Sequence, residues 1–348
     1  MNVLFLINGM RFGGMERQLV EIIRALAARD FKVYLAVLNQ EGPLAGVVEP
    51  FLSAPIRYLD RRKARFFHTL SQLSSLRRLF TIELVYVQDT FSSLYAIPLC
   101  KAGRIKLING SIRHAGVSEG LVYHLEKLLL RSGGKIIANS QAGLDFYGVK
   151  GQVLYNFVDQ SRFSATNAPL SKVVMNANFS NYKDHLTLLF AARKLMKTGI
   201  ISQLGLIGDG PHRGFCQSLC NCLGISDRVV FYGHVQKVED LLLEYGVGVL
   251  CSTLRYKEGI SNSILEYMGS GLIAIGAAVG AVPEIIRDGC NGFLFQAENV
   301  DSLCAVLTRV ISQEDDLQAI RDQAYETLES QFDPVKNCQK LIDVFRSV

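Results

Sequence analysis

The sequence predicts an α/β protein of two domains, each built from a parallel sheet covered by helices. Two observations predict this fold class. Short apolar runs alternate with helical patterns from end to end of the 348 residues, and such alternation is typical of parallel sheets. The alternation is interrupted once, at a polar segment, 156–171, that contains Pro169. We therefore expect one domain over residues 1–165 and a second over residues 166–330.

The elements follow in order from their apolar periodicity. In the first domain we expect strands at 3–7, 32–38, 84–88, 106–108 and 135–138, and helices at 15–28, 70–79 and 121–131. In the second domain we expect strands at 172–176, 203–207, 229–232, 247–251, 272–275 and 293–295. Its expected helices are 185–197, 214–223, 238–243, 263–268, 283–286 and 300–312, and a final helix covers about 334–346.

Composition and charge limit the functional classes. Apolar residues make up 49% of the chain, which is enough for full cores, and the net charge is +5. Residues 1–165 hold 21 Lys and Arg against 12 Asp and Glu, a net +9, whereas residues 166–348 hold 16 against 20, a net −4. This asymmetry indicates that the first half meets an anionic partner.

Neither the cysteines nor the apolar runs indicate an exported or membrane-spanning protein. The eight cysteines include no CxxC pair, so we expect free thiols rather than disulfides or a zinc site, as in a reducing cytosol. The apolar start lacks a basic region and is interpreted as a strand, not a signal peptide. The longest apolar run, 271–282, is too short and too rich in glycine to span a bilayer. The expected location is cytoplasmic, at most peripheral on the inner face of the cell membrane.

The most informative segment places Glu258 and Glu266 eight residues apart, with a turn of small residues and the start of an apolar helix between them. A helix N-terminus can hold a diphosphate, and the two carboxylates can bind hydroxyl groups on either side of it. Eight residues span about 12 Å of helix, which argues against a close acid/base pair. An alternative is purely structural, because Ser263 and Glu266 have the spacing of a capping box.

Three other loops offer phosphate-binding features. Gly13 and Gly14 lie between the first strand and first helix, where backbone can approach an anion. Gly208 and Gly210 form a turn after a strand of the second domain, and Lys183 lies shortly after that domain's first strand. Plain turns and a solvated lysine are the alternatives at these positions.

In the first domain, Arg113 and His114 follow a strand and are candidates for polar roles. A basic run lies earlier, followed by Phe66 and Phe67. It could contact an anionic membrane surface, and a solvated helix face is the alternative. No nucleic-acid-binding module accompanies the charge, so nucleic acid is not an expected partner. The residues of the expected membrane contact are Arg61, Arg62, Lys63 and Arg65.

Together these motifs resemble the retaining glycosyltransferases of family 4, over nearly the whole chain and most strongly from 172 to 311. The first loop carries Gly-Gly-x-Glu at 13–16, and Lys-Asp-His follows at 183–185. Gly-Asp-Gly-Pro lies at 208–211 and Asp-Arg-Val-x-Phe-x-Gly at 227–233. The E-x7-E motif is Glu258 with Glu266, and Gly-x-x-Pro-Glu-x-x-x-Asp-Gly-x-x-Gly begins at Gly280.

The resemblance implies the GT-B fold, with two Rossmann-like domains whose parallel sheets face each other across a cleft, and with helix 331–348 packing back on the first domain. It implies a nucleotide diphosphate sugar as donor, most often a UDP-sugar, bound mainly by the second domain, and a glycan or lipid-linked acceptor bound by the first. The expected pathway is cell-surface polysaccharide or lipopolysaccharide biosynthesis. No metal and no cofactor are expected, since the chain has no DxD-type carboxylate pair.

The resemblance also assigns roles to residues. Glu266 would hold the ribose hydroxyls, Glu258 would face the donor sugar, and Lys183 would stabilise the leaving diphosphate. The catalytic residues are therefore expected to be Glu258, His114 and Lys183, and the acceptor-binding residues Gly13 and Arg113. The donor-binding residues are expected to be Gly14, Lys183, Gly208, Gly210, Gly259, Ile260, Ser261, Asn262 and Glu266.

Three positions depart from the family pattern. Asn178 stands where the family commonly has an arginine, which removes half of the diphosphate clamp unless Arg255 or Arg11 replaces it. Tyr267 stands where alanine is expected, and either Arg113 or His114 occupies the place of the first-domain histidine. Two alternatives to a transferase follow: a non-catalytic protein that keeps the fold, and a nucleotide-sugar epimerase, which lacks the E-x7-E signature.

Overall fold

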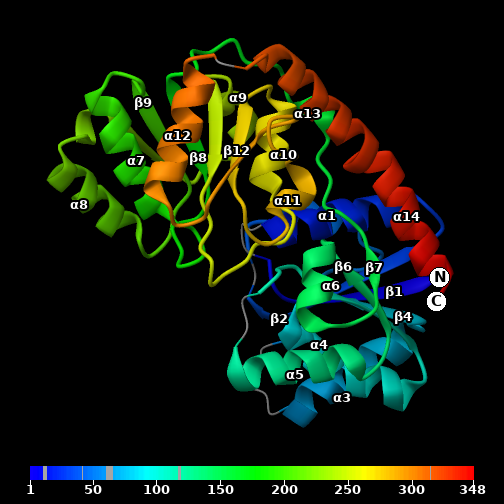
Figure 1. Ribbon diagram of the computed structural model, residues 1–348. Coiled ribbons are helices and arrows are strands. Elements are labelled where there is room, and N and C mark those ends of the chain that lie inside the picture. The colour runs from blue at the N-terminus through cyan, green and yellow to red at the C-terminus, as the bar shows by residue number, and fades with distance from the viewer. Residues whose placement is uncertain (11–13, 41, 60–65, 117–118, 314) are drawn as a thin grey trace. The chain divides into compact units, whose positions relative to one another are not determined.

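The computed structural model describes residues 1–10, 14–40, 42–59, 66–116, 119–313 and 315–348, and these form two compact units. The first consists of Met1–Arg113, Ser118–Tyr155 and Val335–Val348. The second consists of His114–Val117 and Asn156–Pro334. Each unit has its own parallel sheet, so the predicted fold class is confirmed (Figure 1).

The first unit contains a seven-stranded sheet with the order β3-β2-β1-β4-β5-β6-β7, in which every pair is parallel. Its strands are β1 (Asn2–Gly9), β2 (Lys32–Gln40), β3 (Arg57–Tyr58), β4 (Leu84–Val87), β5 (Lys106–Ile112), β6 (Lys135–Ala138) and β7 (Gln152–Val153). Its helices are α1 (Gly14–Ala27), α2 (Ala45–Val48), η1 (Glu49–Phe51), α3 (Phe66–Leu79), α4 (Thr90–Gly103), α5 (Gly120–Arg131), α6 (Gln141–Tyr147) and α14 (Pro334–Arg346).

The two faces of this sheet carry separate cores because side chains alternate along each strand. On β1, Phe5 packs into a cluster with residues of α1 and α14, among them Leu26 and Phe345. Leu6 points to the opposite face and packs with residues of α3 and α4, such as Leu73 and Ala96. Helix α14 therefore completes a core formed by the first part of the chain.

The second unit contains a six-stranded parallel sheet with the order β10-β9-β8-β11-β12-β13. Its strands are β8 (Lys172–Asn176), β9 (Gln203–Ile207), β10 (Val229–Gly233), β11 (Val247–Leu250), β12 (Ile273–Ala277) and β13 (Phe293–Phe295). Its helices are η2 (Gln160–Arg162), α7 (His185–Lys197), α8 (Arg213–Leu223), η3 (Ser226–Arg228), α9 (Val238–Leu242), α10 (Asn262–Gly269), α11 (Val282–Ile285), α12 (Val300–Ile311) and α13 (Leu317–Gln331). Helices α7 and α12 pack together on one face, and α10 packs with α13 on the other (Figure 1).

The strand order reverses once in each sheet. In the second unit, β8 is flanked by β9 on one side and by β11 on the other. The connection after β8 therefore leads toward one edge of the sheet, and the connection after β11 leads toward the other edge. A reversal of this kind opens a crevice at the carboxyl ends of the two strands, where ligands of α/β proteins usually bind. This edge is where the candidate site is found.

The described part of the chain contains no helix that is long and apolar enough to cross a membrane.

Candidate functional site

The loops that follow β8 and β11 lie against each other at the reversal point. Lys183, near the end of the β8–α7 loop, pairs with Ser252 in an isolated antiparallel bridge. The backbone N–H of Asp184 donates to the carbonyl of Cys251 at 3.1 Å. Asp184 in turn caps α7 by accepting from the N–H of Thr187 at 3.1 Å. The lysine is thus positioned by a helix cap and by the neighbouring strand end.

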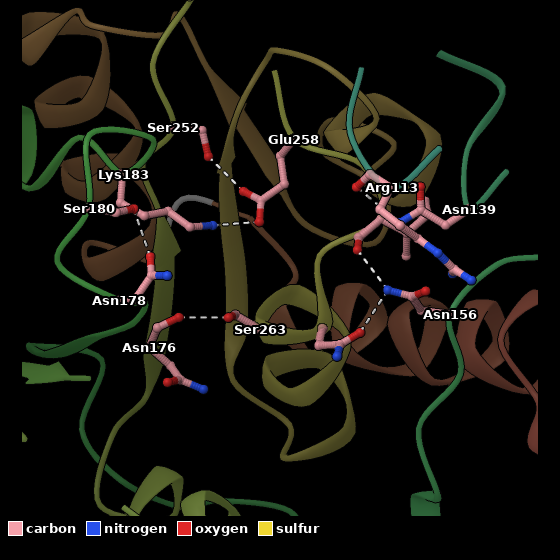
Figure 2. A network of polar contacts seen from close by, with 12 residues as sticks. Arg113, Asn139, Asn156, Asn176, Asn178, Ser180, Lys183, Ser252, Glu258 and Ser263 are labelled. Atoms are coloured by element: carbon pink, nitrogen blue, oxygen red, sulfur yellow. Dashed lines mark hydrogen bonds and ion pairs between the residues drawn. The ribbon is translucent and has the colours of Figure 1, made fainter. Parts of the chain in front are cut away.

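Lys183 and Glu258 form an ion pair at the centre of this edge (Figure 2). The Nζ of Lys183 lies 2.5 Å from Oε1 of Glu258, and the hydroxyl of Ser252 donates to Oε2 of the same carboxylate at 2.9 Å. Both charged side chains are mostly buried, so their attraction is screened less than that of a surface pair. Lys183 and Glu258, which the family resemblance assigns to the same sugar donor, are therefore in contact with each other.

Glu258 is also fixed through its backbone. It pairs with His114 in an antiparallel bridge, and its carbonyl accepts from the N–H of Ala281 at 2.8 Å. A Cβ added to Gly280 would lie 2.3 Å from the same carbonyl, and Gly280 has a φ of +62°. Only glycine fits this close approach without strain. The glycine motif that begins at Gly280 therefore supports the loop that carries Glu258.

Helix α10 begins at Asn262, and its N-cap residue, Ser261, makes no side-chain capping bond. The N–H groups of a first helical turn have no partner within the helix, and they suit an anion. The loop before this turn is held by Asn156, whose amide donates to the carbonyl of Ile260 and to the side-chain oxygen of Asn262, both at 3.0 Å (Figure 2). Gly259, Ile260 and Ser261 are buried, whereas Asn262 is half-buried.

The capping-box explanation of Glu266 is wrong. Ser263 is the second residue of α10 rather than its cap, and its hydroxyl donates to the carbonyl of Asn176 at 2.6 Å. The carboxylate of Glu266 instead accepts from the side-chain amide of Asn176 at 2.7 Å. Glu266 is thereby held at the end of β8 (Figure 2 shows Asn176 and Ser263).

Tyr267 fills space beneath this edge that Gly248 leaves open. Its hydroxyl accepts from the N–H of Asn176 at 2.6 Å and donates to the carbonyl of Val249 at 3.3 Å. A Cβ on Gly248 would lie 2.3 Å from the tyrosine ring. Burial raises the pKa of the Tyr267 phenol, which therefore stays protonated. The departure from alanine at this position is accommodated by a glycine on the adjacent strand.

The turn with Gly208 and Gly210 packs on the loop that follows β8. A Cβ on Gly208 would lie 2.3 Å from the carbonyl of Ala177, and one on Gly210 would lie 2.5 Å from that of Phe179. The residue between these two contacts is Asn178, which is exposed and accepts from the hydroxyl of Ser180 at 2.9 Å. Gly208 and Gly210 therefore allow their turn to pack closely on the loop after β8. That loop carries the amide of Asn178 at the position where the family pattern has an arginine.

In the first unit, Arg113 lies just after β5. Its Nε donates to the carbonyl of Gly110 at 2.9 Å, and its NH2 group donates to the hydroxyl of Tyr86 at 2.8 Å. Gly14 is the first residue of α1 and is exposed. Gly13, Arg11 and the basic residues Arg61, Arg62, Lys63 and Arg65 lie outside the described residues.

Polar residues that the sequence did not single out lie at the carboxyl ends of β1, β4 and β6 and within β5. Asp89 accepts from the N–H of Asn8 at 3.0 Å and caps α4 through Ser92. Burial raises the pKa of the Asp89 carboxyl, and the hydrogen bonds from Ser92 oppose this shift. Nδ2 of Asn109 and Oδ1 of Asn139 are buried and make no hydrogen bond to any described residue. Asp89 and Asn139 could have been selected from the sequence, because polar residues that follow a strand face the ligand edge of such sheets.

No group of three or more His, Cys, Asp or Glu residues in the described ranges is arranged to hold a metal ion.

Family comparisons agree with this architecture. Residues 12–162 match the model described as Glycosyltransferase Family 4, and residues 171–313 match the model described as Glycosyl transferases group 1. The two halves of the chain are thus each similar to a domain described for glycosyltransferases. The two matched ranges meet close to the boundary between the two structural units.

Named relatives match over part of their length. The N-acetyl-alpha-D-glucosaminyl L-malate synthase of Bacillus anthracis is 26% identical over 208 residues, which are 57% of this chain and 52% of the relative. The lipopolysaccharide 1,6-galactosyltransferase of Salmonella typhimurium is 33% identical over 117 residues, 32% of each chain. The chain thus spans about half or less of the length of these relatives.

Solved structures agree over the whole chain. HepE of Anabaena, determined in complex with UDP, superposes with a TM-score of 0.86 and 18% identity, covering 100% of both chains. The apo form of the lipopolysaccharide outer core galactosyltransferase WaaB superposes with a TM-score of 0.77 and 20% identity, covering 100% of this chain and 99% of WaaB. At these identities the agreement establishes the GT-B fold.

Proposed function

We propose that this chain is a retaining, metal-independent glycosyltransferase that uses a nucleotide diphosphate sugar. The observation that carries the proposal is the arrangement at the reversal point of the second sheet. Lys183 pairs with Glu258 in the loop before α10, and Glu266 of α10 is bonded to Asn176 at the end of β8. Both halves of the chain also match glycosyltransferase models.

Within the proposal, Glu266 binds the ribose of the nucleotide and is oriented for this by Asn176. The N–H groups at the start of α10 and the ammonium of Lys183 face the diphosphate. Glu258 faces the sugar, beside the backbone of His114. The first unit binds the acceptor, with Arg113 at the end of β5 among its polar groups.

In the transfer step, the bond between the anomeric carbon and the diphosphate oxygen breaks while the acceptor oxygen bonds to that carbon. Because the configuration is retained, the acceptor oxygen bonds on the face from which the diphosphate leaves. The acceptor hydroxyl passes its proton to the departing diphosphate oxygen, and a nucleoside diphosphate is released. Negative charge grows on the leaving group, so fixed cations and aligned N–H groups stabilise the transition state more than the ground state. This is the role that the proposal gives to Lys183 and α10.

The expected donor is a UDP-sugar, and the expected acceptor is a glycan or lipid-linked glycan of cell-surface polysaccharide or lipopolysaccharide synthesis. Two observations support this choice. HepE has been solved with UDP and with UDP-glucose, and one relative is a lipopolysaccharide galactosyltransferase. A thermal-shift panel of UDP-, GDP- and ADP-sugars identifies the donor, because a bound ligand stabilises the folded state.

Substitutions at the candidate site test the assignment of residues. We expect Lys183→Ala to lower the transfer rate by about 10²–10³-fold, as for loss of one transition-state contact. Glu266→Ala is expected to weaken donor binding, seen as a smaller thermal shift. Lys194→Ala is the matched control, because Lys194 forms an exposed ion pair with Asp301 in the same unit. Transfer at the wild-type rate in both site variants would exclude this assignment.

A non-catalytic protein of the same fold is the second candidate. Asn178 supplies no positive charge, and Lys183 is already paired with Glu258, so the clamp for a diphosphate is weaker than in the family pattern. Calorimetry with the same nucleotide sugars separates the two candidates, since a protein without a donor site binds none of them. An epimerase would release an altered sugar nucleotide in the absence of any acceptor.

A further inference from the structure

Helix α5 exposes four of its apolar residues to solvent, whereas Leu130 is buried in the core. Leu121 is 88% exposed, Val122 57%, Leu125 43% and Leu128 61%. Positions 121, 125 and 128 recur at helical spacing, so they form one continuous stripe. A helix of a soluble domain normally turns such a stripe toward the core, and a stripe that faces outward indicates a contact surface.

Two polar residues of α5, Glu126 and Lys127, bond to neighbouring side chains, whereas His124 and Arg131 are exposed. The carboxylate of Glu126 accepts from the hydroxyl of Thr90 at 2.9 Å and from that of Tyr147 at 2.7 Å. Lys127 donates to the hydroxyl of Tyr123 at 3.2 Å on the same helix. The orientation of α5 is therefore fixed by hydrogen bonds to α4 and α6, and the leucine stripe is held outward.

Helices α3, α4 and α5 form one layer on the first unit. Contacts join α3 to α4 and α4 to α5, and Figure 1 shows the three side by side. The layer exposes further aromatic side chains at Phe66, Phe67 and Phe91. The layer therefore exposes apolar side chains on α3 and α4 as well as on α5.

The helices of this layer are mostly cationic, although the N-cap residue of α5, Glu119, is exposed. The three helices contain a single acidic residue, Glu126, which is the one bonded to Thr90 and Tyr147. The cationic residues of the layer are Arg77, Arg78, Lys101, Lys127 and Arg131. An exposed apolar stripe within a cationic layer matches the interface of an anionic bilayer, which attracts basic groups and accepts apolar side chains.

We propose that the outer surface of the α3–α4–α5 layer docks on an anionic lipid surface, with Leu121, Leu125 and Leu128 entering the boundary between headgroups and acyl chains. A second copy of the chain is a poorer occupant, because a symmetric contact would bring two cationic layers together. The proposal does not depend on any step of the transfer reaction, and it does not use residues 61–65.

Vesicle co-sedimentation of the full chain tests this surface. Wild type is expected to bind vesicles of equal parts phosphatidylglycerol and phosphatidylcholine, to bind pure phosphatidylcholine at least tenfold more weakly, and to lose binding as salt is raised. The triple variant Leu121→Gln, Leu125→Gln, Leu128→Gln is expected to bind the anionic vesicles at least tenfold more weakly, because it removes the apolar stripe. Arg131→Glu is expected to bind the anionic vesicles more weakly than wild type, and its binding is expected to change less as salt is raised.

Phe215→Gln is the matched control. Phe215 lies on α8 of the second unit and is 59% exposed, so its loss is expected to leave vesicle binding unchanged. The triple variant should keep the wild-type melting temperature and the wild-type thermal shift with the UDP-sugar, which separates this surface from the donor site. Glu266→Ala should in turn bind vesicles like wild type.

Three results would overturn the proposal. The first is a wild-type protein that does not sediment with anionic vesicles. The second is a triple variant that binds them as wild type does. The third is light scattering that shows a wild-type dimer which the triple variant converts to a monomer, since a second copy would then cover the stripe.

Discussion

His185 is a buried imidazole at the first position of α7, stacked on Phe179 with ring centroids 4.2 Å apart. Burial lowers the pKa of His185 from 6.5 to about 4, and the nearby charge of Lys183 acts in the same direction. The imidazole is therefore neutral in the folded protein at pH 7. It is the third residue of the Lys-Asp-His motif, and its place in the core explains why an aromatic, uncharged ring suits this position.

A pH dependence of stability follows from this burial. Between pH 6.5 and 4 the unfolded chain takes up a proton at His185 and the folded chain does not, so stability is full above pH 6.5 and falls as the pH drops toward 4. The slope from this group is at most about 1.4 kcal/mol for each pH unit. Urea denaturation of wild type and His185→Asn across this range measures it. A stability difference between the two proteins that stays constant with pH would contradict the prediction.

At the residue scale, the sequence identified the charged groups of the candidate site but not their partners. Glu258, Glu266 and Lys183 could be selected because their motifs are ordered and specifically spaced. Asn176, Asn156 and Ser252 could not, because a single amide or hydroxyl at a strand end or in a loop carries no pattern. Their contribution depends on which loops meet at the edge of the sheet, and only tertiary structure determines that.

The packing of α10 on β11 depends on a large residue opposite a small one. Tyr267 lies over Gly248, and its hydroxyl joins the ends of β8 and β11. We expect Gly248→Ala to destabilise the protein by about 1–3 kcal/mol through overpacking. Tyr267→Ala removes a buried aromatic ring and is expected to cost about 3–5 kcal/mol.

The double variant provides the decisive measurement for this pair. Once the ring is absent, the added methyl group has room, so Gly248→Ala should cost little in the Tyr267→Ala background. Free energies of unfolding from urea denaturation are expected to show a coupling above about 0.5 kcal/mol. If the destabilisations of the two single variants simply add in the double variant, the requirement for glycine at 248 does not come from the Tyr267 ring.

At the element scale, the alternation of strands and helices could be predicted from the sequence, but some individual helices were missed. Strands β8, β9 and β13 and helices α7 and α14 match their expected ranges. Helix α4 was missed because it is apolar on most sides and contains Pro98, which hides the period of an amphipathic helix. Helices α6 and α13 were missed as well, and α6 spans only seven residues.

Across the whole molecule, the chain returns to its first unit through α14. Phe345 is fully buried there, 6.2 Å from Phe5 and 5.5 Å from Tyr86 between ring centroids. We expect Phe345→Ala to destabilise the first unit by about 3–5 kcal/mol. Hydrogen exchange is expected to increase in peptides of β1 and β4 and to stay unchanged in peptides of β8 and β11.

Val335→Ala is the control on the same helix, because Val335 is exposed. Its exchange pattern should equal that of wild type. Equal loss of protection in both units after Phe345→Ala would mean that the two units unfold together, which the separate cores do not predict.

The sequence predicted two parallel sheets, but strand order could not be derived from it. Alternation alone does not say that β8 lies between β9 and β11, and this order creates the edge where Lys183 and Glu258 meet. The excess of positive charge in the first half was visible from composition. The leucine stripe of α5 was not, because its spacing equals that of a buried face, and only the structure shows which side faces out.

The ion pair between Lys183 and Glu258 bears on how fast the proposed enzyme turns over. A lysine that must leave a carboxylate before it meets a phosphate binds the nucleoside diphosphate product less tightly than an unpaired lysine would. Glu258 re-forms its ion pair with Lys183 as the nucleoside diphosphate leaves, and this favours product release. Glu258→Gln should therefore bind UDP more tightly than wild type in calorimetry and show stronger inhibition by UDP, and weaker binding of UDP would argue against this role.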